Sequence, residues 1–326
     1  MEYTIKIALQ SSVITPFQSD TLFGHICWAI RYLWGEKYLV DFLNQYHPEK
    51  TPPLLISNGF PDGYLPKPVL PPVTQDDLGE MKTLGKENRV SDSYKIKSIK
   101  KAELVPISIL HTLQDEPISP KKLFVAMYED KNYYDNVIGA EKSRISMTIR
   151  HNTVNRIKNR VEEGLYDLEE FFCHEGSNIF YVYVKTDRFY RDEIERIFNF
   201  IGENGFGKDK NTGKGHFKVE SIEERIDLPE WENPNSFMTL SSFIPAKTDP
   251  IKGYYRVLKK HGKLGGMYAQ GNPFKRPLLM FQAGSVFFDE TVKSNYGSLL
   301  PDVHHKHKDV RHYAYAFPIG LRIEGI

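Results

Sequence analysis

The segment from residue 205 to residue 217 has the residue types of a phosphate-binding loop. It reads GFGKDKNTGKGHF, in which four glycines, Gly205, Gly207, Gly213 and Gly215, are interspersed with lysines. Glycine adopts positive φ angles without strain and lets main-chain N–H groups approach a ligand, while lysine supplies positive charge. We therefore predict that these glycines and the lysines of the loop contact phosphate, the lysines being Lys208, Lys210 and Lys214.

The loop does not match the two familiar nucleotide-binding motifs. Five residues separate Gly207 from Gly213, and Gly215 stands where a Walker A loop has Ser or Thr. Apolar residues at helical spacing, Ile194, Ile197, Phe198 and Ile201, also predict a helix before the loop, whereas a Rossmann loop follows a strand. P-loop and dinucleotide-binding folds are therefore excluded. A turn that binds nothing remains the alternative.

Positive charge is concentrated in four segments, although the chain as a whole carries only +1. Residues 82–101, 142–160, 202–218 and 247–276 hold 25 basic and 5 acidic residues, so the rest of the chain is acidic. Such polarity suits a basic surface for nucleic acid and an acidic one for a protein partner. Basic segments that are merely solvated are the alternative. Candidate phosphate contacts outside the loop are Arg144, Arg150, Arg156, Lys252, Arg256, Lys263, Lys275 and Arg276.

Other reactive side chains give weaker signals. His25 could act as a general acid or base, but it has no evident partner in the sequence and is more simply structural. His304, His305, His307 and His312 form a cluster without a carboxylate or cysteine at a convincing spacing for a metal site. Two cysteines cannot build a disulfide framework or a cysteine-based zinc site. We expect no metal and no cofactor.

The elements that position these residues indicate an α+β fold. Residues 3–9 alternate as in a strand, and Ser19-Asp20 begins a helix that runs to about Trp34, with a second helix near 38–46. Strands are expected at 104–111, 179–184 and 217–222, and the segment after Ser119-Pro120 is ambiguous between helix and strand. Strand, helix and strand in this order favour a ferredoxin-like sandwich.

Length and composition favour two domains. The chain has 326 residues, 40% of them hydrophobic, and a proline-containing stretch at 227–234 is a candidate boundary. We expect domains at 1–226 and 235–326, with basic insertions near 74–105 and 142–160 in the first, and strands at 237–243, 278–281, 285–288 and 312–323 in the second. The sequence shows neither the charged-then-apolar pattern of a signal peptide nor an apolar run long enough for a membrane helix, so we expect a cytoplasmic location.

These motifs together resemble the RAMP (repeat-associated mysterious protein) superfamily of CRISPR–Cas systems. The glycine loop after a helix is similar to the superfamily's signature, and the start of the first helix, SDTLFG at 19–24, adds to the likeness. Further segments are similar to the group formed by the fourth Csm subunit of type III-A effector complexes: Pro66-Lys67-Pro68, Arg144 with Gly164-Leu165-Tyr166, and 275–287. Lysines and His216 replace the commoner arginines and aromatic residues of the loop.

The resemblance implies two ferredoxin-like (RRM-like) modules and a subunit that does not catalyse a reaction. Such subunits bind the five-prime handle of CRISPR RNA (crRNA) and dock to a large polymerase-like subunit and to an adjacent backbone RAMP subunit. The alternative is a metal-independent RAMP endoribonuclease that processes CRISPR repeat RNA with His25. To the loop and the basic residues named above, the resemblance adds three candidate RNA contacts: Ser19, Asp20 and His25.

Overall fold

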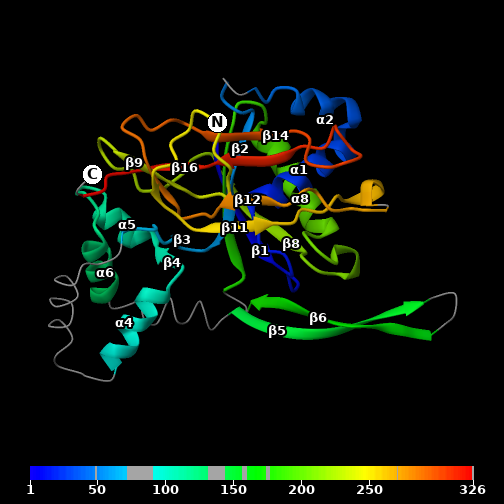
Figure 1. Ribbon diagram of the computed structural model, residues 1–326, viewed down its shortest axis with the longest axis horizontal. Helices are drawn as coiled ribbons and strands as arrows, with labels where there is room; N and C mark the ends of the chain where they lie inside the picture. Colours follow the sequence, from blue (N-terminus) through cyan, green and yellow to red (C-terminus); the bar gives the residue numbers. More distant parts are fainter. Residues whose placement is uncertain are drawn as a thin grey trace.

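The computed structural model confirms the α+β class. It describes residues 1–47, 50–71, 91–130, 144–155, 160–173, 177–269 and 271–324. In these ranges six α-helices accompany several antiparallel sheets (Figure 1). Within the same ranges, every helix is too short or too polar to cross a bilayer.

A four-stranded sheet and two helices form the first module. Its strand order is β2-β7-β1-β8, with every neighbouring pair antiparallel. The helices α1 and α8 connect β1 to β2 and β7 to β8, which is the βαββαβ order of a ferredoxin-like fold. The elements of this module are β1 (Glu2–Leu9), α1 (Ser19–Trp34), β2 (Leu54–Pro61), β7 (Ile179–Thr186), α8 (Arg191–Asn204) and β8 (Phe217–Glu223).

The helical spacing of apolar residues explains why these segments are helices. Leu22, Phe23, Ile26 and Ile30 form the buried side of α1, as the sequence predicts. The buried side of α8 is formed by Ile194, Ile197, Phe198 and Ile201. The second predicted helix, α2 (Glu36–Leu43), starts directly after Gly35, whose φ of 93° ends α1.

A helical insertion follows β2; it differs from the sequence prediction in one place and decides an open alternative in another. Residues 104–111 were predicted to be one strand, but only the first three are extended, because Ile107, Leu110 and Leu113 have helical spacing. After Ser119, which caps the helix through its side chain, the ambiguous segment is a helix. The elements are β3 (Tyr64–Pro66), α4 (Ser91–Lys101), β4 (Leu104–Pro106), α5 (Ile107–Leu113) and α6 (Pro120–Glu129). The predicted insertion's residues 74–90 lie outside the described residues.

The second insertion is a long antiparallel hairpin, which we call the arm. It consists of β5 (Arg144–Asn155) and β6 (Arg160–Cys173), paired along their length from Arg144–Cys173 to Asn155–Arg160. Figure 1 shows the arm extending away from the body of the molecule, below β8. The sequence predicts an excursion from the core here, and the structure gives it a regular form.

The chain after residue 235 is rich in strands, as expected. In residues 235–269 and 271–324 the only helical segment is a 3₁₀ turn, Gly266–Ala269. One antiparallel sheet has the order β10-β13-β9-β16, and β11–β12 and β14–β15 form separate pairs. The strands are β9 (Ser236–Thr239), β10 (Gly253–Tyr254), β11 (Val257–Lys260), β12 (Leu278–Phe281), β13 (Val286–Phe288), β14 (Tyr296–Leu300), β15 (His312–Ala316) and β16 (Pro318–Leu321).

Both halves of the chain contribute to one hydrophobic core. Met238, Leu240 and Tyr313 belong to the same buried cluster as the sheet and helices of the first module. Phe23 of α1 stacks on Tyr313 of β15, with ring centroids 4.7 Å apart. The Tyr313 hydroxyl also accepts a hydrogen bond of 2.9 Å from the main-chain N–H of Ile56 in β2. The second half is therefore packed tightly against α1 and β2.

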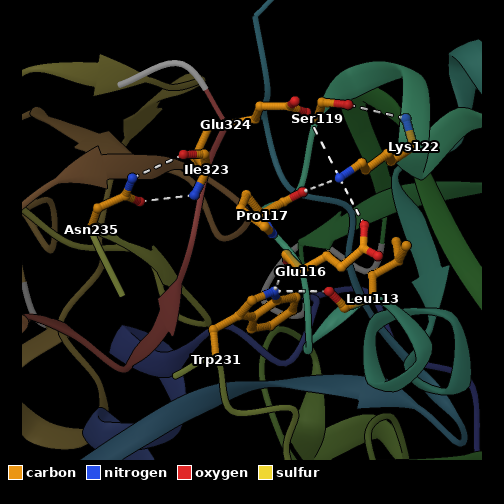
Figure 2. A network of polar contacts seen from close by, with 9 residues as sticks. All are labelled: Leu113, Glu116, Pro117, Ser119, Lys122, Trp231, Asn235, Ile323 and Glu324. Carbon is orange, nitrogen blue, oxygen red and sulfur yellow. Dashed lines mark hydrogen bonds and ion pairs between the residues drawn. The ribbon is translucent and has the colours of Figure 1, made fainter. Parts of the chain in front are cut away.

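A network of polar contacts ties the 227–235 segment to the helical insertion and to the end of the chain (Figure 2). The Trp231 indole N–H donates to the carbonyl oxygens of Leu113 and Glu116, at 3.1 Å each. Asn235 exchanges two hydrogen bonds with the main chain of Ile323, of 2.9 and 2.8 Å. Ile118 pairs with Ile323 in a parallel bridge. The helical insertion is thus fixed to the last strand of the chain.

Candidate nucleic-acid interface

The glycine loop, residues 205–216, begins where α8 ends and packs against the loop that follows β1. Gly205, Gly207, Gly213 and Gly215 all have φ between +70° and +89°. A side chain at Gly215 would place its Cβ 2.0 Å from the Phe206 carbonyl oxygen, so this position requires glycine. Phe206 is buried against Phe17, with ring centroids 4.7 Å apart. The loop is therefore anchored on the core at Phe206.

The main-chain N–H groups of three of these glycines are already used within the protein. Gly207 donates to Nε2 of His25 at 3.0 Å, Gly213 to the Lys210 carbonyl at 3.2 Å, and Gly215 to the Ser12 carbonyl at 2.8 Å. These three N–H groups are therefore already paired, and an approach of the loop to phosphate stays a prediction. A phosphate contact at this loop falls to side chains instead, above all to exposed Lys208 and half-buried Lys210.

His25 connects α1 to the glycine loop. Its ring accepts the Gly207 N–H and lies 4.8 Å from the Phe206 ring, centroid to centroid. Burial, aided by the charge of Lys210, lowers the pKa of His25 to about 4, so the ring is neutral at pH 7. A general acid or base works best with a pKa near the operating pH. The geometry and the pKa both favour a structural role over RNA contact or catalysis.

Ser19 and Asp20, two further candidate RNA contacts, are buried. The Asp20 side chain is 3% exposed, and Lys260 Nζ lies 2.8 Å from its carboxylate. Nε2 of His312 is 3.8 Å away and has no hydrogen bond. The half-buried Lys275 donates to the Arg311 carbonyl at 2.9 Å, and burial lowers its pKa. We call Asp20, Lys260, Lys275 and His312 the Asp20 cluster; it joins α1 to the second half of the chain and does not line a surface.

The arm is less basic than residues 142–160 suggest. Its second strand, β6, carries five acidic residues and one basic residue, and pairing sets this strand beside the basic one. Arg150 and Asp167 face each other in the register, with Nε 3.0 Å from Oδ1. Arg144 lies at the start of β5, and Arg156 falls outside the described residues. The predicted positive charge of this segment is therefore largely balanced.

The root of the arm holds a second buried carboxylate. The Glu170 side chain is 0% exposed and accepts hydrogen bonds at Oε2 from Lys214 Nζ (2.6 Å) and Ser12 Oγ (2.8 Å). Nε2 of His151 lies 3.7 Å from its Oε1. Burial alone would raise the pKa of Glu170, but these hydrogen bonds and charges hold it below its usual value. We call Ser12, His151, Glu170 and Lys214 the Glu170 cluster.

Several of the predicted phosphate contacts remain exposed, on the glycine loop and between residues 252 and 276. Arg276 is paired with Asp302 at 3.3 Å. Lys252 and Lys263 lie over the rings of Phe288 and Phe274, with Nζ 5.8 and 4.8 Å from the ring centroids. Within the described part of the chain, no carboxylate is at ion-pair distance from four exposed cations: Lys252, Arg256, Lys259 and Lys263. Together with Lys208 they are the best candidates for phosphate contact.

Sequence reasoning missed the residues that organise these clusters. No local motif marks Lys260, His312, His151 and Glu170, because their partners are distant in the sequence.

In the His304 loop, both ring nitrogens of His304 are occupied, by the Asn272 carbonyl and by main-chain N–H groups. The described residues contain no group of three or more metal-ligating side chains.

The fold is similar to that of chains in solved structures of Csm assemblies. The sequence matches no protein-family model and no curated protein. A chain in the crystal structure of a Csm1–Csm4 cassette in complex with AMPPNP is similar, with a TM-score of 0.57, 18% identity, and coverage of 99% of this chain and 100% of that one.

A second similar chain comes from the crystal structure of a Csm3–Csm4 subcomplex of the type III-A CRISPR–Cas interference complex. It has a TM-score of 0.54 and 17% identity, over 98% of this chain and 99% of that one. The likeness covers nearly the whole length of both relatives.

Proposed function

We propose that the protein is a crRNA-binding and assembly subunit of a type III-A effector complex, acting in antiviral defence in the cytoplasm. The observation that carries this proposal is the full-length fold similarity to chains of two different Csm assemblies. Csm4 is the subunit that both assemblies have in common, and it is the counterpart we propose for this chain. This agrees with the resemblance that the sequence motifs suggest.

The same two assemblies suggest the protein partners. One pairs Csm4 with Csm1 and the other pairs it with Csm3. We propose that this chain docks to a large polymerase-like subunit of the Csm1 type and to an adjacent backbone subunit of the Csm3 type. The acidic remainder of the chain, outside its basic segments, supports a protein-facing surface.

The RNA partner we propose is the five-prime handle of the crRNA. Support comes from the unpaired exposed cations, Lys208, Lys252, Arg256, Lys259 and Lys263. Four to six phosphate contacts would give a log–log salt slope of about −3 to −4 for single-stranded RNA. Binding that is independent of salt would contradict phosphate recognition.

The direct test is purification of the tagged protein from its host, with sequencing of the bound RNA. We expect two partner subunits and RNAs that share one five-prime sequence. Recovery without RNA, or with RNA of random five-prime ends, would overturn the crRNA proposal. Recovery of RNA without either protein partner would overturn the assembly role.

We also propose that the subunit is not a nuclease, because His25 is neutral and bonded to the glycine loop. Incubation of the purified protein with CRISPR repeat RNA and EDTA should leave the RNA intact. Cleavage that is lost in His25→Ala, with the melting temperature retained, would instead establish the endoribonuclease alternative.

A further inference from the structure

Glu170 differs in its burial from two acidic neighbours on β6, Asp167 and Glu169. On β6, the Asp167 side chain is 47% exposed and Glu169 is also exposed, whereas Glu170 is 0% exposed. Burying a carboxylate is costly unless it is paired and hydrogen-bonded. The buried charge of Glu170 is therefore expected to serve a particular contact.

The partners of Glu170 come from three separate segments. Ser12 belongs to the loop after β1, Lys214 to the glycine loop and His151 to the neighbouring strand of the arm. Beside them, Val13 and Phe171 exchange two main-chain hydrogen bonds of 3.0 and 2.9 Å. The strands of the arm otherwise pack chiefly on each other. Among the described residues, the Glu170 cluster and the Val13–Phe171 pair therefore attach the arm to the body.

The contacts continue from this cluster to the exposed surface. The His151 ring stacks on Tyr166, with centroids 5.5 Å apart and an interplanar angle of 14°. Lys208 Nζ of the glycine loop lies 5.7 Å from the centroid of the Tyr166 ring. Tyr166 is 45% exposed, so an aromatic ring on the arm and a cation on the loop lie side by side at the surface. That pair suits an unstacked base and its phosphate.

We propose that Glu170 is the positioning residue of the arm: it withholds Lys214 from RNA and uses it to fix the arm against the glycine loop. This alignment keeps Tyr166 beside Lys208, where both can meet single-stranded RNA. Lys214 is an internal counter-ion and not a phosphate contact, in contrast to the sequence prediction. The part that concerns RNA rests on the proposed function, whereas the anchoring of the arm does not.

The anchoring is tested without RNA, by measuring a distance between two spin labels. Labels attached through Leu165→Cys on the arm and Tyr190→Cys on the body use two exposed positions, in a background with Cys27 and Cys173 replaced by alanine. We expect a narrow distance distribution in the parent protein and a broad one in Glu170→Gln. The matched control is Glu169→Gln, an exposed neighbour on the same strand, which should keep the narrow distribution.

An unchanged distribution in Glu170→Gln would overturn the proposal, whatever the protein does with RNA. If Glu170→Gln does not fold, Lys214→Met is the milder variant, because it keeps the aliphatic stem and removes only the charge. It should broaden the distribution as well, and a narrow distribution in a folded Lys214→Met protein would overturn the proposal.

The RNA part is tested by salt titration with a labelled oligo(U) of about 12 nucleotides. Each lost phosphate contact lowers the steepness of the log–log slope by about 0.7. Lys208→Gln should show this loss, whereas Lys214→Gln should leave the slope unchanged and weaken binding at every salt concentration. Glu170→Gln frees Lys214, so the slope should steepen by about 0.7 and return to the parent value in the Glu170→Gln, Lys214→Gln double variant.

The outcomes separate this proposal from the proposed function. If Lys214→Gln flattens the slope as much as Lys208→Gln does, Lys214 is an RNA contact and the withholding role is wrong. If the parent protein binds oligo(U) without any salt dependence, the RNA-binding function fails, while the spin-label result still decides the anchoring.

Discussion

Asp20 and Glu170, two of the buried carboxylates among the described residues, have the same kinds of partner but lie in different surroundings. In each cluster a lysine from a distant segment lies close to the carboxylate, 2.8 Å from Asp20 and 2.6 Å from Glu170. In each a histidine Nε2 lies slightly beyond hydrogen-bond distance, at 3.8 and 3.7 Å. Both histidine nitrogens are buried and have no hydrogen bond.

The two clusters differ in how much of the molecule depends on the lysine–carboxylate ion pair. Asp20 is enclosed between α1, β11 and β15, and the His312 side chain is only 3% exposed. Lys260 donates in addition to Gln18 and Thr21 at the start of α1. Glu170 lies at the root of a projecting hairpin, and the side chain of His151 is 28% exposed. The same kind of ion pair therefore stabilises the whole body at Asp20 and orients only the arm at Glu170.

The largest effect is expected from Asp20→Asn. Removing this charge leaves Lys260 buried without its counter-ion, so we expect a loss of about 3 to 5 kcal/mol in the free energy of unfolding, measured by urea denaturation. Glu170→Gln is the matched comparison and should cost only about 1 kcal/mol globally, because the arm root can open locally. Equal losses in the two variants would break the distinction between the clusters.

A smaller loss of stability is expected when the pH is lowered. Burial, with the charge of Lys275, lowers the pKa of His312 to about 4, against the opposing effect of Asp20. Between pH 6.5 and pH 4 the unfolded chain binds a proton at this position and the folded protein does not, so stability falls as the pH falls. We expect His312 to account for about 3 kcal/mol of this loss.

The measurement is urea denaturation at a series of pH values, with Lys260 and Lys275 left in place. His312→Gln should flatten the dependence between pH 6.5 and pH 4, and replacement of the exposed His261 serves as the control. A His312→Gln protein with the same pH dependence as the parent would show that this histidine is not held neutral by burial.

A small effect is also expected at the uncharged hydrogen bonds of Trp231 in Figure 2, which serve as the reference for both charged clusters. Trp231→Phe keeps an aromatic ring but removes the N–H that Leu113 and Glu116 share, at a cost of about 1 to 2 kcal/mol. Urea denaturation measures the loss. Trp231→Ala should cost more because ring packing is lost as well, and a Phe variant as stable as the parent would show that the shared bond contributes nothing.

Much of the fold could be predicted because its signals are local. The spacing of Leu22, Phe23, Ile26 and Ile30 predicts α1, and the strand, helix and strand around 179–222 predict the second half of the first module. The strand predicted at 104–111 is wrong from residue 107 onward, because a short apolar run is compatible with both periods and packing against neighbouring elements decides between them.

The site was harder to predict than the fold because its contacts are long-range. The glycines of 205–215 indicate an unusual backbone correctly, but the sequence does not show that Ser12 and His25 already occupy their N–H groups. Asp20 and Lys260 are 240 positions apart. Likewise, the basic run at 142–160 gives no sign that an acidic strand will pair with it.

The topology of the first sheet also determines when it can form during synthesis. β1 is made first, but its two neighbours in the sheet are β7 and β8, which begin at Ile179 and Phe217. At about 5–20 residues per second, β1 waits roughly 10 to 40 s for its first partner. During that time neither edge of β1 has a neighbouring strand to pair with. We therefore expect β1 of the nascent chain to need shielding at the ribosome until both insertions have been translated.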